Sequence, residues 1–415
     1  MNSLHTTIVV GAGLAGCEVA TSLRQFGYGG RILLVGAEAH LPYRRPPLSK
    51  AYLAGQVDTQ SLQIKPQASY DKASIELLLG RRVESIDRTA RQVVLDDGLR
   101  MGYDKLVLAV GGEPRPLQIA GSDARNVLYL RTIGDVDAIR NEFGPGRRLV
   151  VVGGGYIGLE VAAVARGLGL EVTVLESAAR VLVRVAAPRM SAFYEEVHRG
   201  AGVDLRTGCC IQAFEQLDGR VVAVRLAGDE RIDADLVVIG IGLVPSVALA
   251  RDAGIAVGDG ILVDEHACTE DPDILAVGDC ANHPNELLGR RVRLESVPNA
   301  TEQARTVAGT ICGKLQPYQP VPWFWSDQYN LKLQMVGISD GYDDVVIRGD
   351  PADRHFCAFY LRAGVLIAAD TVNRPSDFMV AKQLVAKRVK VPLEQLADTT
   401  VPLKSLLSTV AALQG

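Results

Sequence analysis

The sequence contains no apolar run long enough to cross a membrane, although nonpolar residues make up 48% of its 415 positions. A membrane-spanning helix needs about 20 predominantly apolar residues in succession. The first seven residues also lack the basic and apolar segments of a signal peptide. We therefore expect a soluble protein of the cytoplasm that does not associate with membranes. The formal net charge of -4 provides no overall basic field, so nucleic acid is not an expected partner.

Cysteine and histidine are scarce and scattered. None of the seven cysteines forms a Cys-x-x-Cys or a Cys-x-x-x-x-Cys motif, which argues against a zinc site and against a dithiol relay. The adjacent Cys209 and Cys210 have a poor geometry for a mutual disulfide, and we expect them to be small buried residues. The six histidines show neither metal-ligand nor triad spacing. We therefore expect no metal and no nucleophile–base pair.

Glycine, by contrast, is abundant, with 42 residues, and it forms two copies of one motif. In the first copy, residues 8–10 are typical of a buried strand, and Gly11, Gly13 and Gly16 complete Gly-x-Gly-x-x-Gly before a stretch with helical spacing. These glycines allow a tight turn, a close approach of the backbone to a pyrophosphate and close packing of helix on strand. A purely structural glycine turn stays an alternative for this copy taken alone.

The same pattern recurs at residues 149–160, where Gly153, Gly155 and Gly158 occupy the three glycine positions. Because each copy lies between an apolar strand and a helical stretch, the repeat favours two dinucleotide sites. We expect one site to hold its dinucleotide permanently and the other to receive a visiting one.

An acidic residue near the end of the second strand of such a unit binds the adenosine ribose. In the second unit, Glu176 directly follows the apolar residues 171–175. Its carboxylate would repel a 2′-phosphate, which predicts a preference for NADH over NADPH, softened by nearby arginines. In the first unit, Glu38 comes slightly late after residues 31–35, so it is either the ribose ligand or a solvated loop residue.

Three further stretches each have a chemical and a structural interpretation. Lys50 follows a rigid proline-rich segment and is either a cation beside the cofactor or a surface lysine. Asp279 follows a glycine at the end of an apolar strand, and it either binds the hydroxyls of a ribityl chain or caps a helix. The two tryptophans, Trp323 and Trp325, either pack in a core or stack beside a cofactor.

Together these stretches carry a family resemblance. The two glycine motifs, LPYRRPPLSK at 41–50, AVGDCA at 276–281, ESVPNA at 295–300 and WFWSDQ at 323–328 resemble the FAD-dependent ferredoxin reductases of bacterial oxygenase systems. The resemblance extends over nearly the whole chain. It implies an α/β fold, related to that of glutathione reductase, with two Rossmann-like dinucleotide-binding domains and a C-terminal α+β domain. The implied boundaries are 1–113 and 243–318 for a split FAD-binding domain, 114–242 for an NAD-binding domain and 319–415 for a C-terminal interface domain.

The resemblance also implies roles for single residues. Tyr156 is similar to the aromatic residue that covers the flavin until nicotinamide displaces it, and Glu160 to the carboxylate that orients the nicotinamide carboxamide. Trp325 is similar to the tryptophan beside the flavin. Ala37 is a departure, because a family member carries an acid there and the adenosine contact then passes to Glu38 or to the backbone. The implied FAD contacts are Gly11, Gly13, Ala15, Gly16, Glu38, Lys50, Val83, Arg131, Asp279 and Val297, and the implied NAD contacts are Gly153, Gly155, Gly158 and Glu176.

The activity that the resemblance implies is that of an NADH-dependent ferredoxin reductase. FAD accepts a hydride from NADH and passes electrons singly to a 2Fe-2S ferredoxin, which feeds an oxygenase. The likeness favours a cytochrome P-450 type monooxygenase, while a Rieske dioxygenase system, a rubredoxin reductase and an oxidase that reduces oxygen stay open. A binding flavoprotein similar to the apoptosis-inducing factors would carry a strongly basic surface, which the net charge does not favour.

Local basic residues predict where the ferredoxin docks. Residues 382–390 are rich in lysine and arginine in a chain that is acidic overall, and they form either a solvated helix face or a docking surface for an acidic protein. We expect Lys382, Lys404 and Arg305 to contact an acidic ferredoxin surface. We expect the reductase itself to be a monomer or a weak dimer.

Overall fold

The structure is a computed structural model that describes residues 5–407. The chain forms two compact units, each assembled from three separate segments. Unit 1 comprises Met1–Arg44, Gln60–Glu113 and Val244–Pro322, and unit 2 comprises Arg45–Thr59, Pro114–Leu243 and Trp323–Gly415. Within residues 5–407, no helix has the length and apolar character needed to span a membrane. No group of three metal-ligating side chains lies together in that range either.

Unit 1 is built on a parallel sheet whose central strands, after a polar first residue, consist mainly of buried apolar residues. Such strands are buried on both faces, as parallel sheets require. Ile8 and Val10 contact one half of the core, whereas Val9 between them contacts the other half. The strand order is β20-β7-β1-β2-β3, with β1 (Thr6–Val10), β2 (Arg31–Gly36), β3 (Ile75–Leu79), β7 (Lys105–Leu108) and β20 (Ile274–Ala276).

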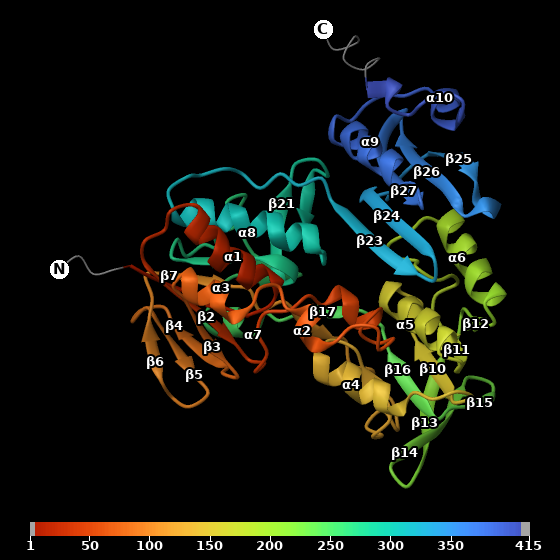
Figure 1. Ribbon diagram of the computed structural model, residues 1–415, viewed down its shortest axis with the longest axis horizontal. Coiled ribbons are helices and arrows are strands. Elements are labelled where there is room, and N and C mark those ends of the chain that lie inside the picture. Colours follow the sequence, from red (N-terminus) through yellow and green to blue (C-terminus); the bar gives the residue numbers. More distant parts are fainter. Residues whose placement is uncertain (1–4, 408–415) are drawn as a thin grey trace. The chain divides into compact units, whose positions relative to one another are not determined.

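Helices cover one face of this sheet and a small antiparallel sheet covers the other. Helices α1 (Leu14–Gln25) and α8 (Val297–Ile311) pack against one another on the side of Val9 (Figure 1). The opposite face carries β4 (Val83–Asp87), β5 (Gln92–Leu95), β6 (Arg100–Gly102) and α7 (Ala248–Asp252). Smaller elements complete the unit: α3 (Gln67–Lys72), β18 (Val257–Gly258), β19 (Gly260–Leu262), η2 (Gly278–Cys280), β21 (Ala281–Asn285) and β22 (Arg290–Val292).

Unit 2 contains a second parallel sheet, which carries the second glycine motif. Its strand order is β12-β11-β10-β16-β9, with β9 (Val127–Tyr129), β10 (Arg148–Val152), β11 (Glu171–Leu175), β12 (Asp204–Arg206) and β16 (Leu236–Ile239). A three-stranded antiparallel sheet of β13 (Ile211–Leu217), β14 (Arg220–Leu226) and β15 (Arg231–Asp233) packs against it. The helices are α4 (Ile133–Glu142), which begins with a capping box at Thr132, α5 (Tyr156–Gly167) and α6 (Pro188–Gly200).

An antiparallel sheet from the C-terminal part of the chain also belongs to unit 2. Its order is β23-β24-β27-β26-β25, with β23 (Trp323–Gln328), β24 (Leu331–Gly337), β25 (Asp344–Asp350), β26 (His355–Arg362) and β27 (Val365–Val372). Helix α9 (Pro375–Ala386) lies along one face of this sheet (Figure 1). The C-terminal part of the chain also contains α10 (Leu393–Ala397) and η3 (Pro351–Asp353). Helices α5 and α6 contact the sheet as well, α5 through β23 and α6 through Phe193, whose ring lies 5.0 Å from that of Phe356.

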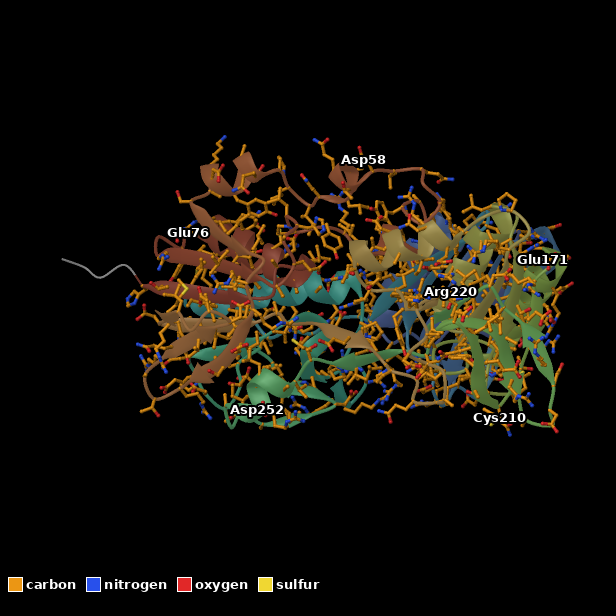
Figure 2. All side chains as sticks on the ribbon, turned by 90° about the horizontal axis from the view of Figure 1, so that it is seen from below. Asp58, Glu76, Glu171, Cys210, Arg220 and Asp252 are labelled. Atoms are coloured by element: carbon orange, nitrogen blue, oxygen red, sulfur yellow. The ribbon has the colours of Figure 1, made fainter. Side chains whose placement is uncertain are left out.

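Where the chain passes from one unit to the other, its elements are short. These are η1 (Pro46–Ser49), α2 (Thr59–Leu62), β8 (Gly112–Pro114) and β17 (Leu243–Pro245). The predicted fold class is confirmed, because both glycine motifs lie between a parallel strand and a helix. The predicted three-domain boundaries stay a prediction. One expectation is wrong: Cys210, labelled in Figure 2, is exposed rather than buried, and Cys209 is only partly buried.

Candidate dinucleotide and nicotinamide sites

The first glycine motif forms a turn between β1 and α1 that leaves open space at its second glycine. Gly11 has a φ of +112°, and a Cβ there would lie 2.2 Å from the carbonyl oxygen of Ala109. A Cβ at Gly16 would lie 1.9 Å from the carbonyl oxygen of Gly11. At Gly13, the residue before α1, a Cβ would meet no atom within 4 Å. Backbone packing therefore requires the first and third glycines, whereas the second leaves room for a ligand.

The second glycine motif repeats this geometry before α5. A Cβ at Gly153 would lie 2.5 Å from the carbonyl oxygen of Gly240, and one at Gly158 would lie 2.1 Å from that of Gly153. At Gly155 the nearest atom would be 3.9 Å away. Both helices begin without a side-chain cap, so their first N–H groups are available to an anion. The residues therefore fit a pyrophosphate at each motif, and we name the motifs the first cradle (Gly11–Gly16) and the second cradle (Gly153–Gly158).

The two predicted ribose ligands differ in their surroundings. Glu176 borders the second cradle: its carboxylate accepts hydrogen bonds from the backbone N–H of Gly154 at 2.7 Å and of Ala178 at 2.8 Å. Glu38 instead accepts a hydrogen bond from the Tyr43 hydroxyl at 2.6 Å. Glu176 therefore has a fixed position beside its cradle. The choice between ribose ligand and loop residue for Glu38 stays open.

A buried carboxylate lies two residues after the second cradle. Glu160 of α5 is 3% exposed. One of its oxygens accepts hydrogen bonds from Lys50 Nζ at 2.6 Å and from Ser49 Oγ at 2.5 Å, and the other accepts one from Ser326 Oγ at 2.6 Å. Charge-assisted hydrogen bonds of this kind fix a carboxylate in one orientation. Lys50 is therefore an ion-pair partner of Glu160 rather than an isolated surface lysine.

Aromatic rings form a row that begins at Tyr156, the first residue of α5. The ring of Tyr156 lies 5.1 Å from that of Phe324, and its hydroxyl contacts the sulfur of Met335. Burial raises the pKa of Tyr156 well above its usual value, so its hydroxyl stays protonated. Trp325 follows at 6.2 Å from Phe324 and 5.7 Å from Trp323. The row thus leads along β23 from the N-terminus of α5 to Trp323.

The ammonium group of Lys382 lies over the last ring of this row. Its Nζ is 5.0 Å from the centroid of Trp323, a cation–π geometry. The ring of Phe378, which like Lys382 belongs to α9, packs against Trp323 at 5.6 Å. The prediction of a solvated helix face therefore does not hold for Lys382, because the ammonium group of this residue contacts the Trp323 ring.

The remaining predicted site residues divide between the units. In unit 1, Gly278 has a φ of +79°, and a Cβ there would lie 3.0 Å from the Cβ of Ala15, so Asp279 follows directly beside the first cradle. Asp279 lies inside η2 and is not a helix cap, whereas Ser296 caps α8 ahead of Val297. Val83 is a buried residue of β4, and Arg305 is exposed on α8. In unit 2, the Arg45 guanidinium donates to the backbone carbonyl of Arg131, and Lys404 is exposed.

The residues that sequence reasoning missed surround Glu160. Ser326 donates to it, and Ser326 is in turn bonded to Gln328, which contacts His198. Ser326 and Gln328 lie within the WFWSDQ stretch, where the tryptophans drew attention. The sequence did contain a signal for these residues. Ser326 and Gln328 occupy alternate positions of an aromatic-rich strand, and polar side chains that a strand buries need hydrogen-bond partners.

Comparisons with known proteins agree with this geometry. Residues 5–304 match the model of the pyridine nucleotide-disulphide oxidoreductases, and residues 323–407 match the reductase C-terminal model. The chain is 49% identical to putidaredoxin reductase CamA of Pseudomonas putida over 99% of both chains. It is 41% identical to the ferredoxin–NAD(+) reductase component of a p-cumate 2,3-dioxygenase system of Pseudomonas putida, over 96% of this chain and 97% of that one. The reductase in the covalent putidaredoxin reductase–putidaredoxin complex superimposes with a TM-score of 0.96 at 48% identity, covering 99% of this chain and 100% of that one.

The chain therefore belongs to the pyridine nucleotide-disulphide oxidoreductase family. Within that family it belongs with the ferredoxin reductases that carry a reductase C-terminal domain. This confirms the predicted family, the predicted oxidoreductase class and the predicted pair of cofactors, FAD and NAD(H).

Proposed function

We propose that this protein is an NADH-dependent reductase that passes single electrons from FAD to a 2Fe-2S ferredoxin. The observation that carries the proposal is the second cradle together with Glu160, which follows the cradle by two residues on α5. One end of α5 thus offers a pyrophosphate site and, beside it, a carboxylate held by three donors. Bound FAD supplies the conversion between a two-electron hydride and single electrons.

In this proposal each side chain of unit 2 has a task that needs no proton transfer to the hydride. Glu176 binds the adenosine ribose of NADH and disfavours a 2′-phosphate. Glu160 accepts the carboxamide N–H of the nicotinamide. Lys50 donates a hydrogen bond to the Glu160 carboxylate and so fixes its position, and Tyr156 covers the place that the nicotinamide will take. The side chains thereby contribute orientation, which supplies most of the rate of such a transfer.

The same proposal assigns the first cradle to FAD. Ala15, Asp279 and Val297 belong to the same unit as this cradle, and Gly278 brings Asp279 beside Ala15. Gly13 leaves room for the pyrophosphate, and Asp279 is the proposed partner of the ribityl hydroxyls. Val83, Arg131 and Lys50 stay proposed FAD contacts.

We also propose that the ferredoxin docks where the aromatic row ends. Trp325 is next to Trp323 in the row, and Lys382 places a cation over Trp323. A cation at this position suits the acidic surface expected of the partner, with Lys404 and Arg305 as further candidates. The rate of ferredoxin reduction should then fall as ionic strength rises, since salt screens exposed charges beyond about 10 Å at 0.1 M. A rate that is indifferent to salt would contradict charge-assisted docking.

The experiment that tests the function itself is NADH oxidation by the purified flavoprotein with and without a 2Fe-2S ferredoxin. We expect rapid ferredoxin reduction and slow oxygen reduction, and NADH should be more efficient than NADPH. Equal turnover with oxygen alone would identify an oxidase instead. Similar reductases are named for a CYP199A2 system and for a p-cumate 2,3-dioxygenase system, so we propose a cytochrome P-450 type monooxygenase as terminal acceptor, with a Rieske dioxygenase as the second candidate. Reconstitution with each terminal oxygenase separates these two.

A further inference from the structure

A chain of hydrogen bonds runs through the interior of unit 2 and ends on Glu160. The Tyr329 hydroxyl lies 3.2 Å from Nδ1 of His198, and Nε2 of His198 lies 2.9 Å from Oε1 of Gln328. Nε2 of Gln328 lies 3.2 Å from Oγ of Ser326, and that hydroxyl lies 2.6 Å from Oε1 of Glu160. Five side chains from α5, α6, β23 and the turn after β23 are therefore linked without a gap.

The Glu160 carboxylate at the end of this chain determines which group donates and which accepts in each hydrogen bond. Glu160 is paired with Lys50 and can only accept, so Ser326 must donate its single proton to Glu160. The Ser326 oxygen then accepts from the amide N–H of Gln328, which leaves Oε1 of Gln328 facing His198. His198 must therefore carry its proton on Nε2 and accept the Tyr329 proton on Nδ1. Every donor points toward the carboxylate.

The burial of these polar side chains is not explained by stability. Ser326 and His198 are 0% exposed and Gln328 is 1% exposed. Burial lowers the pKa of the His198 imidazole below its usual value, which keeps the ring neutral as the donor pattern requires. Apolar side chains of the same volume often stabilise a core as well as a buried polar network does. A network that is complete and ends on one carboxylate therefore points to a role in the site.

The backbone at the outer end of the chain is also unusual. Tyr329 has a φ of +54°, a left-handed conformation that costs a bulky residue free energy. This conformation ends β23 and places the Tyr329 ring against the His198 ring, with centroids 5.1 Å apart and planes inclined by 58°. Since Tyr329 is also 38% exposed, it connects the buried chain with the surface.

We infer that Tyr329, His198, Gln328 and Ser326 are positioning residues that together hold the Glu160 carboxylate in the orientation needed for nicotinamide. The inference rests on the proposed function only in the task given to Glu160. The chain is not a proton pathway, because the Gln328 amide keeps both its protons and cannot pass one on. Its effect is on orientation, and it should weaken with each link away from Glu160.

Three substitutions test this gradient. Ser326→Ala removes the donor to Glu160, Gln328→Met removes the next link, and Tyr329→Phe removes the last at a partly exposed position where folding is not at risk. The readout is flavin bleaching by NADH in stopped flow, which needs no ferredoxin. We expect the second-order rate constant for flavin bleaching by NADH to fall about tenfold in Ser326→Ala, several-fold in Gln328→Met and about twofold in Tyr329→Phe.

The matched control is Thr371→Val. It also removes a fully buried hydroxyl of unit 2, but this hydroxyl bonds only the backbone carbonyl of Gln334. We expect the control to lower the melting temperature as much as Ser326→Ala does while leaving bleaching by NADH unchanged. Bleaching rates that follow melting temperature across all four variants would overturn the inference.

A second readout does not depend on activity. Long-range proton–nitrogen NMR of histidine-labelled protein should show His198 neutral, with its proton on Nε2. Loss of that pattern is expected in Gln328→Met. A His198 ring protonated on Nδ1, or on both nitrogens at pH 7, would overturn the donor direction. If the flavin of the unchanged protein is not bleached by NADH at all, the proposed function fails, whereas the NMR result still decides whether the chain exists.

Discussion

Each of the two units contains a glycine cradle of the same geometry, but the units differ in the ionisable side chains that they bury. In each cradle a Cβ at the third glycine would strike the carbonyl oxygen of the first glycine, at 1.9 Å in unit 1 and 2.1 Å in unit 2. The ionisable carboxyl and guanidinium side chains that are buried among residues 5–407, namely Glu160, Arg348 and Asp370, all lie in unit 2. The buried polar side chains of unit 1 are hydroxyls, amides and one histidine.

This difference matches the two proposed tasks, namely retention of FAD by unit 1 and orientation of nicotinamide by unit 2. A buried ion pair adds little to stability, because desolvation of two charges offsets their attraction. Unit 2 nevertheless buries Glu160 against Lys50. Buried charge is therefore present in the unit proposed to receive a visiting nicotinamide, whereas the unit proposed to keep FAD uses close backbone packing and neutral groups.

The largest effect is expected where the cradles are alike. Gly16→Ala and Gly158→Ala each force a Cβ into a backbone oxygen, which no side-chain movement can relieve. We expect each to lower the free energy of unfolding by about 3 kcal/mol or more, measured by chemical denaturation. Gly167→Ala is the control, because its Cβ at the end of α5 meets no atom within 4 Å and should stabilise slightly. Tolerance of both cradle variants would refute the packing argument.

The second glycine of each cradle tests whether the two cradles bind different ligands. Gly13→Ala and Gly155→Ala place a Cβ in open space, so both variants should fold. We expect Gly13→Ala to be purified with little flavin, and Gly155→Ala to stay yellow but to lose about a hundredfold in kcat/KM for NADH. Flavin content by absorbance and bleaching kinetics measure the two outcomes. If Gly155→Ala lost its flavin and Gly13→Ala kept it, the assignment of the cradles would be reversed.

Asp370 is a buried carboxyl group of unit 2 whose charge depends on pH. Burial raises the pKa of its carboxyl to about 7, although the Tyr360 hydroxyl at 2.7 Å partly opposes this. The folded state therefore binds this proton between about pH 4 and pH 7 while the unfolded state does not, so the contribution to stability falls as pH rises through that range and is level above it. Asp370→Asn removes this dependence. Relative to the unchanged protein, the variant should gain on the order of 2 kcal/mol between pH 5 and pH 8 in denaturant titrations. A difference that does not vary with pH would show that Asp370 is ionised throughout.

The smallest effect concerns the two candidate ribose ligands. Glu176→Ala should lower kcat/KM for NADH about fivefold to tenfold and raise it for NADPH, because a fixed carboxylate beside the second cradle is lost. Glu38→Ala decides between the two interpretations of Glu38: loss of flavin would identify a ribose ligand, and unchanged flavin content would identify a loop residue bonded to Tyr43. Steady-state kinetics with both nucleotides and flavin absorbance provide the measurements. Equal efficiencies before and after Glu176→Ala would remove its assigned role.

The sequence was sufficient to predict the features that depend on neighbouring residues. The strands before both cradles, the helices after them and the turns between them follow from apolar runs and glycine spacing within about ten residues. The resemblance added the family, which the comparisons confirm, and roles for Tyr156 and Glu160, which stay predictions. Helix α6 and strand β25 were not predicted as a helix and a strand from their local sequence patterns.

The surroundings of Glu160 could not be predicted in this way. Ser326 is 166 positions away from Glu160, and Gln328 is 130 positions away from His198. Such pairs meet only when two separate segments fold together, and nothing local in a single sequence records the meeting. Lys382 is a similar case, because its basic neighbours suggested a solvated face while the folded chain places it over Trp323.

Strand β23 contributes successive residues to opposite sides of its sheet, as any strand does. Phe324, Ser326 and Gln328 point toward α5 and α6, whereas Trp323 and Trp325 alternate with them and Trp323 meets α9. If the ferredoxin docks at the end of the aromatic row as proposed, substitutions at Trp323 should change the choice of redox partner and leave the contacts of Glu160 intact. Insertion or deletion of one residue within this strand would exchange both sets at once. Divergence among such reductases should accordingly proceed here by replacement of side chains and not by changes of length.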